Sequence, residues 1–78
     1  MQMKYIRFKY AGFVVFEETQ THKSIAKRFP TDEIESAGFV SGTFDKEYLG
    51  CHGESTTLNV SSKPNDSEWL YRRLSVYS

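Results

Sequence analysis

Polar and apolar side chains alternate over residues 5–10, the first strand that the sequence predicts. A period of two among β-favouring residues is typical of a strand with one face on the core. The alternation separates two faces: Ile6, Phe8 and Tyr10 on one, and Tyr5, Arg7 and Lys9 on the other. The second face combines an aromatic ring with two cations and is therefore a candidate binding surface. The alternative is that Tyr5 packs under the helices while Arg7 and Lys9 extend into solvent.

Ala11-Gly12 interrupts this alternation. Because glycine readily adopts the positive φ of a tight turn, we predict a hairpin here, with a β-bulge as the alternative. The returning strand, residues 13–17, is apolar on both faces. This pattern favours a position inside the sheet rather than at its edge.

The apolar spacing changes to that of a helix over residues 21–29. Thr21 can accept a hydrogen bond from the amides of the first turn. Ile25 and Phe29 share one face of the helix. The helix should end before Pro30, because the residue preceding a proline avoids the helical conformation.

A third strand is predicted over residues 35–44, and residues 31–38 can alternatively begin with a helical turn. Gly38 and Gly42 inside this strand indicate bulges or the close approach of another backbone.

Residues 48–51 and 56–61 predict a second hairpin. Leu49 and Cys51 would face the core from one strand, and Leu58 and Val60 from the other. Residues 52–55 would connect the two strands, with Gly53 as the turn residue, and residues 61–65 are a loop by composition.

A C-terminal helix is predicted over residues 67–76, capped by Asn65 or Asp66. Acidic residues near its start and basic residues near its end follow the order that the helix dipole favours. The predicted buried stripe consists of Trp69, Leu70 and Leu74.

These elements predict an α+β fold: an antiparallel sheet of four to five strands with a short helix near 21–29 and a C-terminal helix near 67–76. The 78 residues suit a single small domain. The single cysteine excludes an intrachain disulfide, which fits a reducing compartment. Neither a signal peptide nor a membrane-length apolar run is visible, so a small soluble protein of the cytoplasm is expected, with no membrane partner.

The chemistry-bearing residues match no catalytic or metal-binding pattern. Cys51 and His52 are adjacent on a predicted strand and would point to opposite faces, so they do not form a nucleophile–base pair. With His22 added, the three residues still lack the spacing of a zinc site. Residues 50–55 lack the Gly-Lys-Ser/Thr ending of a phosphate-binding loop. We expect a non-enzymatic protein with no catalytic residue, no metal and no cofactor.

Binding is the function that these exclusions leave. The candidate binding residues are Tyr5, Arg7, Lys9, Tyr71, Arg72 and Arg73. Aromatic side chains, 15% of the chain, and arginine are enriched at protein interfaces. The expectation is a protein-binding accessory module of a bacterium or phage that acts by occupying a partner, as a homodimer. The alternative is a single-stranded nucleic-acid-binding domain that uses an aromatic and basic sheet face, which the zero net charge favours less.

Overall fold

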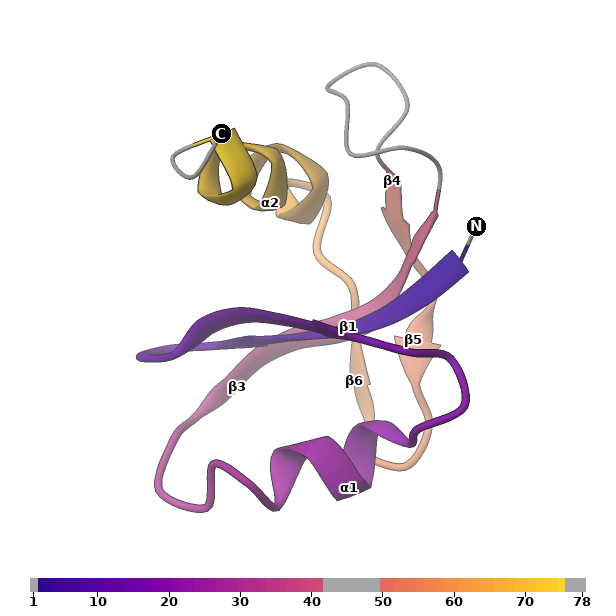
Figure 1. Ribbon diagram of the computed structural model, residues 1–78, viewed down its shortest axis with the longest axis vertical. Helices are drawn as coiled ribbons and strands as arrows, with labels where there is room; N and C mark the ends of the chain where they lie inside the picture. The colour runs from indigo at the N-terminus through magenta and orange to yellow at the C-terminus, as the bar shows by residue number, and fades with distance from the viewer. Residues whose placement is uncertain (1, 42–49, 76–78) are drawn as a thin grey trace.

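The computed structural model describes residues 2–41 and 50–75, and within these ranges the fold is α+β (Figure 1). The elements in chain order are β1 (Gln2–Phe8), β2 (Gly12–Phe16), α1 (His22–Ala26), β3 (Ile34–Ser41), β4 (Gly50–His52), β5 (Glu54–Ser55), β6 (Val60–Ser61) and α2 (Asp66–Ser75). Four strands form an antiparallel sheet in the order β2-β1-β3-β4, and β5 pairs with β6 in a separate sheet. The predicted fold class is confirmed.

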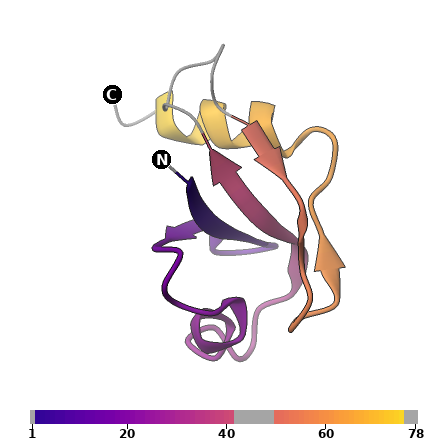
Figure 2. The same cartoon turned by 90° about the vertical axis from the view of Figure 1, so that its right-hand side faces the viewer.

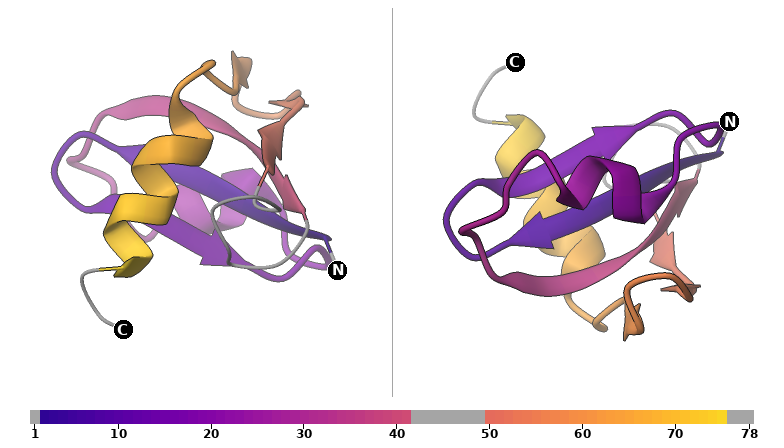
Figure 3. Two further views of the ribbon diagram at one scale, coloured as in Figure 1. Left: turned by 90° about the horizontal axis from the view of Figure 1, so that it is seen from above. Right: turned by 90° about the horizontal axis from the view of Figure 1, so that it is seen from below.

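The two helices cover opposite faces of the four-stranded sheet (Figures 1 and 3). The buried cluster on the α1 side consists of Ile6, Phe8, Phe16, Ile25 and Ala37. The buried cluster on the α2 side consists of Tyr5, Val40 and Leu70. Because successive residues of a strand point to opposite faces, Tyr5 and Ile6 enter different clusters, and both are fully buried. The β5–β6 hairpin lies beside β3 (Figure 2).

β1 and β2 form the predicted hairpin, in which Phe8 pairs with Gly12 and Arg7 with Phe13. Gly12 has φ +79°, a conformation that side-chain-bearing residues rarely adopt. The carboxylate of Asp32 accepts hydrogen bonds from the hairpin loop, from the N–H of Tyr10 at 3.0 Å and of Ala11 at 2.8 Å. The loop is therefore fastened to the segment that precedes β3.

α1 begins as predicted, with the Thr21 hydroxyl accepting a hydrogen bond from the Ser24 N–H at 3.1 Å. The helix ends at Ala26, before the predicted end at Phe29. The N–H groups of Arg28 and Phe29 bond to carbonyls three residues earlier, which tightens the last turn into 3₁₀ geometry.

β3 confirms the predicted third strand as far as Ser41, and residues 42–44 lie outside the described residues. Residues 30–32 form a turn, so the alternative helical start does not occur. A Cβ at Gly38 would stand 2.5 Å from the His52 carbonyl oxygen. This confirms the predicted close approach of another backbone at Gly38.

β2 lies at the edge of the sheet, so its predicted place inside the sheet is wrong. Its side chains still pack on both sides, Phe13 and Val15 toward α2 and Val14 and Phe16 toward α1. A strand between two helical layers is covered on both faces wherever it stands in the strand order. Two apolar faces therefore indicate the layers above and below a strand and not its lateral position.

The predicted second hairpin is also wrong. β4 pairs with β3, with Cys51 opposite Val40, whereas Val60 pairs with Ser55. Gly53, at φ +77°, turns the chain between β4 and β5 rather than closing a hairpin. In such short segments, the alternation of polar and apolar side chains is compatible with any antiparallel neighbour. The sequence pattern therefore does not indicate which strand is the partner. Leu49 lies outside the described residues.

α2 confirms the C-terminal helix, which begins at Asp66. Leu70 is buried as predicted, but Trp69 is 43% exposed, so its assignment to the buried stripe is wrong. Its ring instead lies between two arginine side chains at the edge of the helix–sheet interface. The side chain of Leu74 and residue 76 are outside the described part of the chain.

The buried His22 of α1 predicts how stability depends on pH. Its Nε2 lies 2.8 Å from the Gly38 carbonyl oxygen, and its ring packs edge-on against Phe16 and Phe39. Burial lowers the pKa of His22, an effect that the Gly38 carbonyl opposes and the nearby Lys4 reinforces. The unfolded chain then binds more protons than the folded chain below about pH 6.5, the ordinary histidine pKa. The free energy of unfolding should therefore fall as the pH drops from 7.5 toward 5.5.

Urea unfolding at a series of pH values measures this effect. The His22→Gln variant should lose most of the pH dependence in that window, because glutamine can still donate to the Gly38 carbonyl but does not titrate there. The matched control is His52→Gln, at an exposed histidine, which should keep the wild-type profile. Equal slopes for wild type and His22→Gln would contradict the prediction.

Candidate functional site

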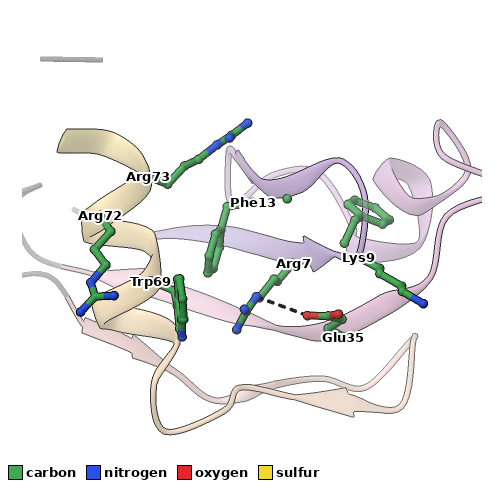
Figure 4. A pocket seen from close by; sticks show the side chains of 9 residues that line it. Arg7, Lys9, Phe13, Glu35, Trp69, Arg72 and Arg73 are labelled. Carbon is green, nitrogen blue, oxygen red and sulfur yellow. Dashed lines mark ion pairs between the residues drawn. The ribbon is translucent and has the colours of Figure 1, made fainter. Parts of the chain in front are cut away.

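A pocket of about 430 Å³ lies between the β1–β2 hairpin and α2 (Figure 4). Its lining combines four cations, one carboxylate and three aromatic rings: Arg7, Lys9, Arg72, Arg73, Glu35, Phe8, Phe13 and Trp69, together with Gly12. The strands supply one wall and the helix the other. The site is therefore built on regular elements, which hold side chains more firmly than loops do.

Arginine side chains and aromatic rings lie next to one another in this pocket (Figure 4). The Arg7 guanidinium carbon lies 5.4 Å from the ring centre of Phe13 and 5.5 Å from that of Trp69. The guanidinium carbon of Arg72 lies 5.3 Å from the same Trp69 ring. Two arginines thus share one exposed tryptophan, an arrangement that cation–π attraction stabilises. We call Arg7, Phe13, Trp69 and Arg72 the arginine–aromatic row.

A buried carboxylate fixes the position of Arg7. Asp66, at the start of α2, is fully buried and accepts hydrogen bonds from the Tyr5 hydroxyl at 2.5 Å, the Lys63 N–H at 2.9 Å and Arg7 at 3.3 Å. Glu35 on β3 lies 3.5 Å from Nε of the same arginine. Because both ends of the guanidinium are engaged, its plane is held in front of Phe13 and Trp69.

The same contacts determine the protonation of Asp66 and Tyr5. Burial by itself raises the pKa of Asp66, but the donors from Lys63, Tyr5 and Arg7 outweigh it, and the pKa lies below its ordinary value. Burial and the Asp66 carboxylate raise the pKa of Tyr5. At neutral pH, Asp66 is an anion and the Tyr5 hydroxyl keeps its proton, so each has the form that the hydrogen bond needs.

Two of the other cations of the pocket also have acidic neighbours. Lys9 lies 3.7 Å from Glu33, and Arg72 lies 2.8 Å from Glu68 one helical turn away. These pairs are largely exposed, so water weakens them and an incoming anion can compete for the cation. Arg73 extends along the hairpin beside Gly12 (Figure 4).

The structure brings four of the six predicted binding residues to one pocket: Arg7, Lys9, Arg72 and Arg73. Tyr5 is fully buried beneath α2 and does not line the pocket. Tyr71 is half-buried and lines a neighbouring pocket at the start of α2, together with Pro64 and Asn65. Tyr5 therefore belongs to the packing between helix and sheet, and Tyr71 belongs to a second surface.

Sequence reasoning missed Phe13, Trp69 and Glu35 as lining residues. The sequence pattern predicts Trp69 in the buried stripe of the C-terminal helix and Phe13 in a strand that is apolar on both faces. One signal was available, since Trp69 and Arg72 are three apart on a helix and share a face. A second was the hairpin register, which places Phe13 opposite Arg7.

The cysteine and the histidines lie apart from this pocket. Cys51 is half-buried on β4 and packs on the α2-side cluster, and its N–H donates to the Ser67 hydroxyl at 2.8 Å. Burial and the Asp66 carboxylate raise the pKa of its thiol to about 11, although Ser67 lowers it. His52 is exposed, stacks on Phe39 and lies 3.2 Å from the Ser41 hydroxyl. Over residues 2–41 and 50–75, no group of three His, Cys, Asp or Glu side chains is arranged to hold a metal ion.

In the described ranges, no helix has both the length and the apolar character needed to cross a bilayer. Comparison of the chain with protein-family models, curated proteins and solved structures gave no match. Evidence on function therefore comes from the side chains of this protein and their arrangement.

Removing the charge of Asp66 should destabilise the fold. Asp66→Asn keeps the side-chain shape but loses the anion that Arg7 and Tyr5 face, and breaking one partner of a buried ionic network costs about 3 kcal/mol. The matched control, Glu68→Gln, removes an exposed carboxylate of the same helix and should change stability by about 0–1 kcal/mol. Urea unfolding measures both, and equal stabilities for the two variants would show that Asp66 does not anchor α2.

The thiol of Cys51 should react slowly. With a pKa of about 11, its thiolate fraction at pH 7 is on the order of 10⁻⁴, so an aromatic disulfide reagent should modify it about a hundredfold more slowly than free cysteine. The same reaction in concentrated urea is the control and should proceed at the ordinary rate. A folded-state rate equal to that of free cysteine would contradict the prediction, and a faster rate would mark Cys51 as an activated nucleophile.

Proposed function

We propose that this chain is a non-enzymatic protein-binding module that acts by occupying a partner protein through the pocket between the β1–β2 hairpin and α2. The observation that carries the proposal is the arginine–aromatic row. Tryptophan and arginine are the residue types that dominate binding energy at protein interfaces. Here they stand side by side in a concave site, with Trp69 43% exposed. The cytoplasm is the compartment that we propose, since it keeps the free thiol of Cys51 reduced.

The chemistry of the lining indicates what the partner presents. Four cations face one carboxylate in the pocket, so its occupant should bring acidic groups. The apolar surfaces of Phe13 and Trp69 should be covered by an apolar or aromatic side chain of the same segment. We therefore propose an acidic segment of the partner that carries an aromatic residue beside its carboxylates.

A single-stranded nucleic acid is the alternative occupant, because it is also anionic and has planar bases. The described charges favour it less. Lys9, Arg7 and Arg72 each have a carboxylate within 4 Å, so the positive charge is confined to the pocket and does not extend into the long basic surface that a polyanion follows. In addition, α2 covers Tyr5, so the sheet face is closed to the stacking of successive bases.

Tryptophan fluorescence tests the proposal directly, because Trp69 is the single tryptophan of the chain and lines the pocket. A synthetic peptide of alternating glutamate and phenylalanine should shift the emission in a saturable manner. A peptide with lysine in place of glutamate should not. The double variant Arg72→Gln/Arg73→Gln removes two exposed pocket cations and should weaken binding of the acidic peptide about tenfold, since two exposed ion pairs of about 0.7 kcal/mol each sum to about 1.4 kcal/mol.

The matched control is Lys23→Gln/Lys27→Gln, which removes two exposed cations on the α1 side and should leave the affinity for the peptide unchanged. Equal losses in the two double variants would mean that the peptide responds to overall charge and not to the pocket. Binding of an oligothymidine, steeply weakened by salt, without binding of the acidic peptide would establish the alternative. Binding of neither probe would overturn the assignment of the pocket.

A further inference from the structure

We infer that Glu35 is a specificity-determining residue of this pocket: it accepts a hydrogen bond from a lysine or arginine side chain of the bound segment. The segment then carries a cation on one side of its aromatic residue and a carboxylate on the other. This inference rests on the proposed function and adds a feature of the partner that the proposed function leaves open.

Glu35 is the single carboxylate among the described residues that line the pocket. The fold already supplies Arg7 with the fully buried Asp66, 3.3 Å away, so Arg7 does not need Glu35 to balance its charge. Glu35 contacts Arg7 through one oxygen, Oε2, at 3.5 Å from Nε, and its side chain is 37% exposed. An ionised carboxylate has two oxygens with about four acceptor sites, so Glu35 can accept a further donor from the pocket.

A series of contacts places Glu35 at one end of the pocket (Figure 4). The Trp69 ring centre lies 5.3 Å from the guanidinium carbon of Arg72 and 5.5 Å from that of Arg7. Arg7 in turn contacts Glu35. An aromatic side chain that covers Phe13 and Trp69 would therefore have Arg72 on one side and Glu35 on the other.

Carboxylates outnumber cations at the Glu35 end of the pocket. The cations there are Arg7 and Lys9. The carboxylates are Glu35 itself, Asp66 beside Arg7, Glu33 at 3.7 Å from Lys9, and Asp32, which is bonded to the adjacent hairpin loop. An incoming carboxylate therefore meets like charge at this end, whereas an incoming cation meets opposite charge.

The carboxylates of the bound segment fit the other end, which α2 forms. Arg72 and Arg73 line the pocket from this helix. Glu68 is paired with Arg72, but the pair is exposed, so an incoming carboxylate can compete with it. The pocket therefore suits a segment in which an acidic and a basic residue flank an aromatic one. Alternate residues of an extended segment point to the same side, so the sequence Glu-Ser-Phe-Ser-Lys would present all three.

Two end-blocked peptides measure this preference. The mixed peptide Glu-Ser-Phe-Ser-Lys and the acidic peptide Glu-Ser-Phe-Ser-Glu differ only in the residue expected at Glu35. Titrations followed by the fluorescence of Trp69 should give the mixed peptide at least about threefold higher affinity, the gain typical of one exposed ion pair. In Glu35→Gln, which keeps the shape of the side chain but not its charge, the two affinities should become equal.

The matched control is Glu54→Gln, which removes an exposed carboxylate on β5, outside the pocket. This variant should keep the wild-type preference for the mixed peptide. Equal loss of the preference in both variants would mean that the peptides respond to overall charge, and would overturn the inference.

A crosslink on the unmodified protein needs no variant to fold. A carbodiimide joins an amine to a carboxylate that it contacts, so it should link the lysine of the mixed peptide to Glu35, as mass spectrometry of the digested product would show. The same peptide with an acetylated lysine is the control and should form no link through that residue. Linkage to Glu54 or Glu68 without linkage to Glu35 would contradict the inference.

The outcomes of the titrations separate this inference from the proposed function. Equal affinities of the wild type for the two peptides would overturn the role of Glu35 and leave an acidic, aromatic partner standing. A preference for the mixed peptide that persists in Glu35→Gln would have the same consequence. Binding of neither peptide would overturn the proposed function and this inference together.

Discussion

Asp66 places a negative charge inside a very small protein, where an unpaired carboxylate would cost several kcal/mol. Its partners come from two directions. Tyr5 and Arg7 belong to the central strand β1, and the Lys63 N–H belongs to the loop that leads into α2. The position of α2 on the sheet follows from this arrangement, because the helix start must lie where all three donors reach one side chain.

Arg7 connects the buried Asp66 to the surface, because it bonds to this carboxylate and also lines the pocket. One guanidinium nitrogen of Arg7 is ion-paired with the buried Asp66, and its Nε is ion-paired with Glu35. The guanidinium also lies near the rings of Phe13 and Trp69. The pocket therefore has a floor that is part of the protein interior and a rim of exposed cations. A binding site of this kind is preorganised, since its central cation is held by contacts that the fold itself requires.

The parts of the fold that depend on neighbours in sequence could be predicted. The period of two indicated β1, although the strand covers Gln2–Phe8 rather than residues 5–10 and Tyr10 lies exposed in the turn. Gly12 indicated the hairpin, and Thr21 and Pro30 indicated the limits of α1. The errors concern contacts between distant residues. The apolar pattern of β2 could not show its lateral position, and the alternation around Cys51 and Val60 could not show which strands they pair with.

Trp69 was misplaced because its environment is made by Arg7, which is far away in sequence. The basic members of the candidate site were found by residue type, whereas the grouping of Phe13, Trp69 and Glu35 required the packing of α2 on the sheet.

The hydrogen bond between Tyr5 and Asp66 joins residues that are 61 positions apart in the chain. During synthesis, β1 and β2 leave the ribosome early and can pair as a local hairpin. The face of β1 that α2 covers, with the Tyr5 hydroxyl and Arg7, then stays open until nearly all of the described chain has emerged. Native contacts of such long sequence separation close late and slow the search for the folded state. Until Asp66 has been synthesised, the strand face with Tyr5 and Arg7 therefore lacks the helix that covers it in the folded protein, and such an exposed apolar face favours aggregation.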